Sequence, residues 1–402
     1  MRLSVYLRKM THRPKYIALC FYTLIFQPYP AIAGPDWQLS GYGTIGASVT
    51  SESSSEFRVE MTQFKGVKDD IDFGLRSKLA VQLTAEFDSK FSATGQVLAK
   101  RRGDKDLDPE VEWLFASYKP ISEFDLRAGR LALPIFMLSD FRSVGFAQPF
   151  VEPPGNVYID ASVSRFDGVQ LLNRFDLGSG SLQIQTSLGD SSEEILLGAI
   201  SFLPPIDTDI DEIQAINFVY EWKNWSFRAG KFIADIDFPE TILQLDVPSP
   251  LPMGPPTVTI NRPLSEVLPD FEDDFTGYGI QYDNGTLVTM VEITRRSAKS
   301  ASTGTRFTDS DVSYALVGWR FGDWLPSAMI TDRENNSPLS AITVSNYKTT
   351  TLTLRYDLST NMALKFQYEE VAPDDATWLN TSPAFTAGED QNVYTISFDF
   401  VF

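Results

Sequence analysis

Charged side chains recur at the polar positions of segments in which polar and apolar residues alternate. Charges of both signs also gather in one long connection, residues 132–163. The connection carries Asp140, Arg142 and Glu152. Fixed charges that face one another across confined water orient dipolar solutes and select ions. Residues of these types could set such a field if they enclose water, although each could instead be an ordinary solvated polar position. The basic residues in the polar phase are Arg76, Lys78, Lys100, Arg127, Arg228, Arg355 and Lys365.

Histidine and cysteine each occur once, as His12 and Cys20, and both lie in the N-terminal stretch that ends in an apolar run. If that stretch is removed, the chain keeps neither the commonest general base nor a thiol ligand. We therefore expect no Ser-His chemistry, no metal site, no disulfide and no cofactor. The sequence does not predict an enzyme, and a hydrolase would need a Ser, Asp or Lys mechanism.

A glycine motif, Gly41-Tyr-Gly43-Thr-Ile-Gly46, satisfies the dinucleotide-binding pattern G-x-G-x-x-G. No strand precedes it, and the following residues 50–56 are rich in Ser and Glu and predict no helix. We interpret these glycines as part of a strand.

The N-terminus predicts export. Basic residues precede an unbroken apolar run at 16–26, and Ala31-Ile32-Ala33 offers a cleavage site. Residues 1–33 are therefore predicted to be a cleaved signal peptide for Sec-type export, and residues 34–402 a single domain. The basic residues are Arg2, Arg8, Lys9, Arg13 and Lys15.

The chain of 402 residues has a formal net charge of −19, which becomes about −24 without the basic leader. This acidity argues against a nucleic-acid partner. It fits an exposed surface where divalent cations bridge acidic loops to anionic lipid such as lipopolysaccharide.

Alternation with a period of two is the dominant pattern, and it predicts strands with one apolar and one polar face. In residues 73–87, Leu75 is expected on the apolar face and Arg76 on the polar face. In residues 110–115, we expect Val111, Trp113 and Phe115 to share a face. About sixteen strands result, with boundaries that sequence patterns fix only loosely. They are residues 37–48, 73–87, 91–100, 110–115, 124–128, 165–175, 181–189, 212–222, 225–233, 275–282, 286–296, 311–321, 324–332, 349–357, 362–371 and 391–402.

The connections between these strands alternate strictly between short and long. The tightest contains Asn284-Gly285, which predicts a type I′ turn. Tryptophans flank two of the short turns, as expected at a membrane–water interface. The pattern predicts an all-β fold, a transmembrane antiparallel β-barrel with short periplasmic turns and long extracellular loops. The long segment 234–273, rich in proline and acid, could cap the pore, meet a neighbouring subunit or stay unfolded.

The C-terminal residues 394–402, with aromatic rings at alternate positions, resemble the signature of Gram-negative outer-membrane porins. Residues 319–326 are similar to late porin strands, and residues 126–134 match the place where porins enter their long third loop. The resemblance implies insertion by the barrel-assembly machinery, a homotrimer, and an inward fold of residues 132–163 that narrows the pore. This sequence departs from the family in one respect: its long third loop lacks the acidic Pro-Glu-Phe-Gly-Gly-like stretch that many general porins carry there. The implied assembly signal comprises Tyr394, Phe398, Phe400 and Phe402, the last closing the barrel against the first strand.

These observations predict an outer-membrane porin, a water-filled channel for passive diffusion of small hydrophilic solutes or ions. The alternative is a barrel plugged by its loops, with a structural, adhesive or binding role. The predicted pore-lining residues are Arg76, Lys78, Lys100, Arg127, Asp140, Arg142 and Glu152.

Overall fold

The computed structural model shows one folded unit, Asp36–Phe402. The predicted signal peptide, residues 1–33, lies outside the described residues. These are residues 34–53, 56–60, 62–103, 105–158, 163–195, 206–237, 242–248, 257–263, 270–301, 303–336, 346–373 and 390–402.

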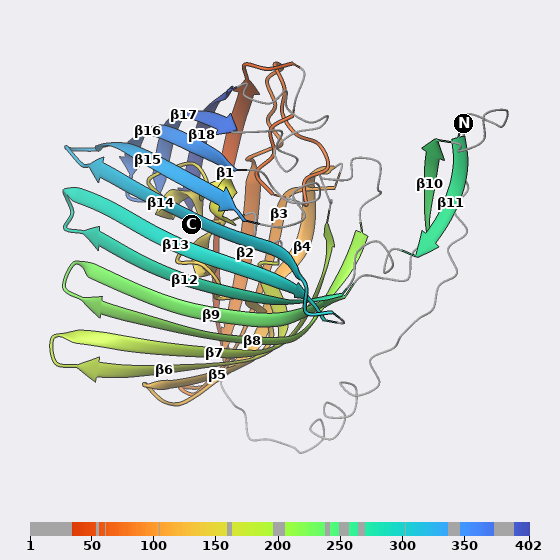
Figure 1. Cartoon of the computed structure of the whole chain (residues 1–402). Coiled ribbons are helices and arrows are strands. Elements are labelled where there is room, and N and C mark those ends of the chain that lie inside the picture. The colour runs from red at the N-terminus through yellow and green to blue at the C-terminus, as the bar shows by residue number, and fades with distance from the viewer. Residues whose placement is uncertain are drawn as a thin grey trace. The chain divides into compact units, whose positions relative to one another are not determined.

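Sixteen antiparallel strands close into a barrel (Figure 1). Strands that follow one another along the chain pair, except that β9 pairs with β12 and that β1 pairs with β18 to close the barrel. This confirms the predicted fold class and strand number. The strands are β1 (Asp36–Thr50), β2 (Lys78–Glu86), β3 (Phe91–Arg102), β4 (Lys105–Ile121), β5 (Phe124–Ala132), β6 (Arg165–Leu177), β7 (Gly180–Ile195), β8 (Ile206–Trp222), β9 (Trp225–Asp237), β12 (Phe271–Asp283), β13 (Leu287–Ser300), β14 (Arg306–Trp319), β15 (Trp324–Asn335), β16 (Tyr347–Ser359), β17 (Met362–Pro373) and β18 (Gln391–Val401).

A separate two-stranded sheet pairs β10 (Ile242–Pro248) with β11 (Thr257–Pro263). Both strands fall in the segment 234–273, for which the sequence predicted no strand. Prolines and acidic residues there obscured the short Val- and Ile-containing runs that form the pair.

Burial alternates along the strands and separates two faces. In β9, Arg228, Phe232 and Ala234 are buried, whereas Trp225 and Phe227 are exposed. The exposed face is apolar on nearly every strand, for example at Leu79, Val81 and Leu83 of β2. An apolar outer face and a mixed inner face follow from the period-two pattern when the sheet closes on itself.

The connections differ in length between the two ends of the barrel. At one end the turns are short, as predicted, and β8 and β9 are joined only by residues 223–224. The other end carries the long connections, with two exceptions: β3 and β4 are separated only by residues 103–104, and β13 and β14 only by residues 301–305. The predicted long connection at 101–109 is therefore wrong. The type I′ prediction is also wrong, because Gly285 has a positive φ but Asn284 does not. Instead, the Asn284 carboxamide oxygen accepts hydrogen bonds from the backbone N–H groups of Thr286 and Leu287.

The prediction that Val111, Trp113 and Phe115 of β4 share one face is wrong, because the register of β4 shifts between Gln96 and Val97 of β3. Gln96 pairs with Trp113, and Val97 pairs with Val111. The extra residue places Trp113 and Phe115 in the opposite phase from Val111, since one inserted residue reverses every following side chain. Leu114 between them is 61% exposed on the outer face.

The predicted second strand also begins too early. β2 starts at Lys78, and Leu75 precedes it. Leu75 lies in a small buried cluster with Phe57, Val67 and Tyr347, so its predicted place on the outer face is wrong. The connection after β1 therefore folds onto the barrel and buries apolar residues of its own.

The barrel closes between β1 and β18. Phe402 exchanges two backbone hydrogen bonds with Gly41, of 2.9 and 3.0 Å, and Ile45 lies opposite Phe398. This confirms the predicted closure by the C-terminal residues. The described helices are one α-helical turn, α1 (Gly155–Tyr158), and two 3₁₀ turns, η1 (Ser139–Phe141) and η2 (Gly145–Ala147).

In the described part of the chain, no helix has the length and apolar character needed to span a membrane.

Candidate functional site

The connection between β5 and β6 lies inside the barrel. We call its described residues 133–158 the inward loop. They contact inward-facing side chains of strands on the opposite wall, such as Lys365 of β17 and Thr331 of β15. These strands are far from β5 and β6 around the barrel, and the residues contacted face inward. The loop can reach them only by passing through the interior of the barrel.

Basic side chains of the wall hold the inward loop by its backbone carbonyl groups. Arg355 donates to the carbonyls of Phe146, at 2.6 Å, and Gln148, at 2.9 Å. Lys365 donates to those of Gly145 and Phe150, both at 2.7 Å. Carbonyl groups of an irregular loop have no ladder partners, so buried ones need donors from elsewhere. The lumen-phase cations Arg355 and Lys365 supply them.

The same arrangement occurs at two other places along the loop. Arg228 of β9 donates to the carbonyl of Pro134 at 2.8 Å. Arg333 of β15 donates to the carbonyl of Asn156 at 3.0 Å. The loop is thus held near its start, its middle and its end.

Lys365 is also half of a fully buried ion pair. Its Nζ lies 2.9 Å from the carboxylate of Asp399 in β18, and both side chains have no exposed surface. The hydroxyl of Thr44 in β1 donates to the same carboxylate at 2.5 Å. Gly145 lies directly against this group, because a Cβ there would stand 2.3 Å from the Asp399 Oδ1. Glycine is therefore required where the loop touches the closure of the barrel.

Glu292 of β13 holds the first residues of the loop from the wall. Its carboxylate accepts hydrogen bonds from the backbone N–H of Met137, at 2.6 Å, and from the hydroxyl of Tyr158, at 3.1 Å. Arg228 lies 3.4 Å away and balances the charge. A buried carboxylate needs such partners, since an unpaired one would be costly to desolvate.

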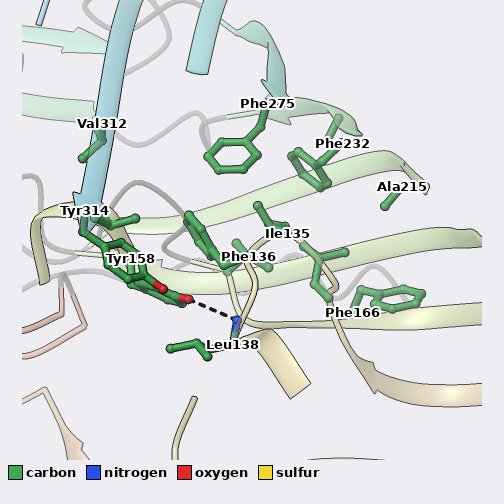
Figure 2. Close-up of a cluster of buried hydrophobic side chains, with 14 of the residues drawn as sticks. Ile135, Phe136, Leu138, Tyr158, Phe166, Ala215, Phe232, Phe275, Val312 and Tyr314 are labelled. Atoms are coloured by element: carbon green, nitrogen blue, oxygen red, sulfur yellow. Dashed lines mark hydrogen bonds between the residues drawn. The ribbon is translucent and has the colours of Figure 1, made fainter. Parts of the chain in front are cut away.

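Apolar packing fixes the loop against one half of the inner wall. Figure 2 shows Ile135, Phe136 and Leu138 of the loop among wall residues such as Phe232 and Phe275. The rings of Phe136 and Phe275 meet edge to face at 5.0 Å. This contact removes both partners from water, so part of the lumen is dry.

Ion pairs join the loop to the other half of the wall. Glu152 of the loop lies 2.8 Å from Lys78 and 3.9 Å from Arg76. Arg76 also pairs with Glu369 of β17. The predicted basic wall and loop carboxylate are therefore in contact, and their charges neutralise each other locally.

A second charged group lies beside the first. Glu60, from the connection between β1 and β2, pairs with Lys100 at 2.5 Å and with Arg142 of the loop at 3.3 Å. Burial favours the neutral carboxyl of Glu60, but the cations of Lys100 and Arg142 outweigh this and hold the pKa of Glu60 well below its ordinary value. Glu60 is thus ionised at neutral pH.

The structure brings together five of the predicted pore-lining residues: Arg76, Lys78, Lys100, Arg142 and Glu152. The other two lie elsewhere. Arg127 pairs with Asp125 of its own strand at 2.9 Å and covers the ring of Phe115. Asp140 lies in η1 and lines a separate cavity.

Sequence reasoning missed three acidic partners of this site. Glu292 and Glu369 lie at polar positions of predicted strands, and this alternation could have identified them as inward-facing residues. Glu60 lies in a polar connection without a periodic pattern, so nothing in the sequence pointed to it.

The predicted assembly residues Tyr394, Phe398 and Phe400 lie in β18, and Phe402 follows it. All four belong to the outer face, where Tyr394 is 51% and Phe402 is 56% exposed. The rings of Phe400 and Phe402 lean over β1: a Cβ at Gly41 would stand 2.4 Å from the ring of Phe402, and one at Gly43 equally close to that of Phe400. The glycine motif of β1 thus makes room for the C-terminal rings.

No family model and no curated protein sequence matches this chain. Solved structures match its fold. An anion-selective porin from Comamonas acidovorans is 13% identical, with 92% of this chain and 100% of that one covered, and a TM-score of 0.55. The outer-membrane channel DcaP of Acinetobacter baumannii is 10% identical, with coverage of 92% and 99% and a TM-score of 0.55. The trimer form of OmpT, an outer-membrane protein of Vibrio cholerae, is 11% identical, with coverage of 92% and 100% and a TM-score of 0.55. The chain has the 16-stranded barrel fold of outer-membrane porins.

Proposed function

We propose that this chain forms a water-filled channel in the outer membrane for passive diffusion of small hydrophilic solutes or ions. The observation that carries the proposal is the contrast between the two faces of the barrel. The outer face is apolar, whereas the inner face carries buried polar residues such as Gln96, Gln170 and Asn217. A sheet that is apolar outside and polar inside suits lipid on one side and water on the other.

The inward loop would narrow this channel, and its charged contacts would set what passes. The loop residues Arg142 and Glu152 lie beside Lys78 and Lys100 of the wall. Paired charges leave a small local field, so we expect weaker ion selectivity than a wall of unpaired cations would give. The proposal assigns no catalytic residue, cofactor or metal to the chain.

A plugged barrel with a structural or binding role is the second candidate. The dry packing of Phe136, Leu138 and Tyr158 against the wall favours it, because this contact fills part of the lumen with side chains. The two candidates differ in one measurable property, which is the passage of ions and solutes.

Conductance of the purified protein in a planar bilayer tests the proposal. Stepwise currents support the channel, and an absence of current at every voltage contradicts it. Swelling of liposomes in a small sugar supplies a second measurement. A plugged barrel should admit neither ions nor sugar.

Single cysteines locate the water-filled path, because the sequence contains only Cys20, within the predicted leader. Gln82 of β2 hydrogen-bonds Gln96 of the inner face, and its neighbour Val81 is on the outer face. We expect Gln82→Cys to react with a charged, membrane-impermeant thiol reagent and lose conductance. Val81→Cys, the matched control, should stay unreactive in the bilayer. Equal reactivity of the two variants would contradict the assigned faces.

We further propose that the barrel is inserted by the barrel-assembly machinery, contacts lipopolysaccharide and forms a homotrimer. The similar OmpT structure is described as a trimer, which supports the last point. Chemical cross-linking of intact outer membranes, followed by unheated electrophoresis, would distinguish a trimer from a monomer. Membrane fractionation tests the location.

A further inference from the structure

The connection between β1 and β2 also enters the barrel. We call its described residues 56–60 and 62–75 the strap. Phe57 and Val67 of the strap exchange two backbone hydrogen bonds, of 2.8 and 2.9 Å, so the chain doubles back on itself there. Their side chains are buried among inward-facing residues of three strands, which are Tyr347 of β16, Val371 of β17 and Val393 of β18. The strap therefore packs on the inner wall.

A buried glutamine fixes the shape of the strap. Gln63 is only 3% exposed. Its carboxamide oxygen accepts hydrogen bonds from the backbone N–H groups of Val59, at 3.0 Å, and Glu60, at 3.3 Å, and its amide nitrogen donates to the carbonyl of Leu75 at 3.2 Å. Each of these bonds satisfies a backbone group that has no ladder partner. Together they hold Glu60 in a fixed position within the strap.

The strap meets the inward loop at two points. Glu60 lies 3.3 Å from Arg142 of the loop. The backbone of Val59 lies against Gly155 of the loop, because a Cβ at Gly155 would stand 3.6 Å from the carbonyl oxygen of Val59 and 3.9 Å from its Cα. The space left between strap, loop and wall has a volume of about 20 Å³, which is about the size of one water molecule. The two connections therefore close this side of the barrel together.

Glu60 balances two cations. It lies 2.5 Å from Lys100 of β3 and 3.3 Å from Arg142, and among the described residues it is the only carboxylate at ion-pair distance from either. One further carboxylate acts on Lys100, but it already pairs with two arginines of the wall: this is Glu112, with Arg102 and Arg165. Loss of the charge of Glu60 would therefore leave two cations without a paired carboxylate beside the loop.

We propose that the strap forms the second half of the constriction and that Glu60 determines its preference between anions and cations. This inference rests on the proposed function and extends it, because it needs a water-filled path beside the loop. One unit charge about 5 Å from an ion in water alters the local concentration of that ion about fourfold. The Glu60 carboxylate cancels one such positive charge, so the constriction favours chloride less than its cations alone would.

The reversal potential in a gradient of potassium chloride tests the role of Glu60. For Glu60→Gln, we expect the permeability ratio of chloride to potassium to rise about fourfold at about 0.1 M salt, where charges within about 10 Å are incompletely screened. Asp70→Asn removes the same charge from an exposed position of the strap and is the matched control, so its ratio should equal that of the parent protein. An unchanged ratio in Glu60→Gln, or an equal rise in both variants, would overturn the inference.

A second substitution separates charge from folding. Glu60→Gln combined with Lys100→Met removes one of the two cations that the first change leaves unpaired, so the permeability ratio should return toward that of the parent protein. A strap that had merely come loose would not be restored by the loss of another charged side chain. A ratio that stays raised in the double variant would therefore overturn the role of Glu60. A heat-dependent shift in electrophoretic mobility confirms that each variant is folded.

A disulfide tests the position of the strap without any current. Val59→Cys combined with Gly155→Cys brings two thiols within bonding distance. After oxidation of outer membranes, alkylation should find two fewer free thiols than in the reduced sample. Val59→Cys combined with Glu123→Cys, at an exposed short turn on the opposite end of the barrel, should lose none. Absence of the first disulfide from folded barrels would overturn the contact between strap and loop.

The two kinds of failure are distinguishable. A parent protein that never conducts would contradict the proposed function and, with it, the role of Glu60 in ion preference, whereas the disulfide would still decide whether strap and loop close the barrel together. A parent protein that conducts, but whose Glu60→Gln variant keeps the parent's permeability ratio, would contradict this inference alone.

Discussion

Replacement of Lys365 by methionine should loosen the inward loop more than any other single change in the wall. Lys365 is fully buried, pairs with Asp399 at 2.9 Å and donates to the carbonyls of Gly145 and Phe150. Methionine keeps the length of the side chain but removes the charge and the donors. The Asp399 carboxylate would then be buried without its cation, which typically costs about 3–5 kcal/mol.

A double-mutant cycle measures this loss. Asp399→Asn keeps an acceptor for the hydroxyl of Thr44 but leaves the Lys365 ammonium buried without its anion, so it should also cost about 3–5 kcal/mol. The double variant leaves no uncompensated charge, so its cost should fall short of the sum of the single variants by about 2 kcal/mol. The measured quantity is the free energy of unfolding by urea in lipid vesicles.

The result that refutes the reasoning is additivity. If the two single costs simply add, Lys365 and Asp399 do not stabilise each other, and the loop is held by other contacts. Lys348→Met is the matched control, because this side chain is 66% exposed beside Asp332. It should change the free energy of unfolding by less than about 1 kcal/mol.

Three further predictions concern assembly and pH. Gly41→Val should lower the amount of folded, heat-modifiable barrel in the outer membrane, because a Cβ there would meet both the ring of Phe402 and the carbonyl of Ala80 at 2.5 Å; normal amounts would contradict this fit. Phe402→Ala should also lower assembly, and it should partly rescue Gly41→Val by clearing space for the new side chain; folded barrel in outer-membrane extracts is the measurement. Glu60 has a lowered pKa in the folded protein, so its contribution to stability is present above the unfolded value of about 4.3 and is lost as pH falls through the folded value. The difference in unfolding free energy between the parent protein and Glu60→Gln should therefore stay constant from about pH 8 to 5 and shrink only below about pH 4; a decline already at pH 6 would contradict the assigned ion pairs with Lys100 and Arg142.

The strands could be predicted from the sequence because lipid and water impose opposite demands on successive residues. All sixteen barrel strands were located, and the short turns between them were placed within a few residues. The phase of β4 was predicted wrongly, because a bulge reversed Trp113 and Phe115. A bulge depends on how two strands pair, which neither strand reveals alone.

The candidate site was predicted only in part, for a different reason. The basic residues stand out in the polar phase of their strands, so Lys78 and Lys100 could be named. The partners of two other basic residues, Arg355 and Lys365, could not be named. These side chains bind backbone carbonyls, and every residue of a loop has a carbonyl. Which carbonyls they bind depends on the path of the loop through the barrel, and no periodic pattern encodes that path.

The union of β1 with β18 has a consequence for the order of events during biogenesis. Thr44 and Asp399, which meet across this union, are 355 residues apart in the chain. Bringing such distant segments together costs about 5 kcal/mol of chain entropy before any contact is gained. Until the last strand arrives, β1 presents unpaired N–H and C=O groups that can pair with other chains. The arrival of β18 therefore removes the last free edges on both sides at once, and a barrel that lacks this strand stays open to aggregation.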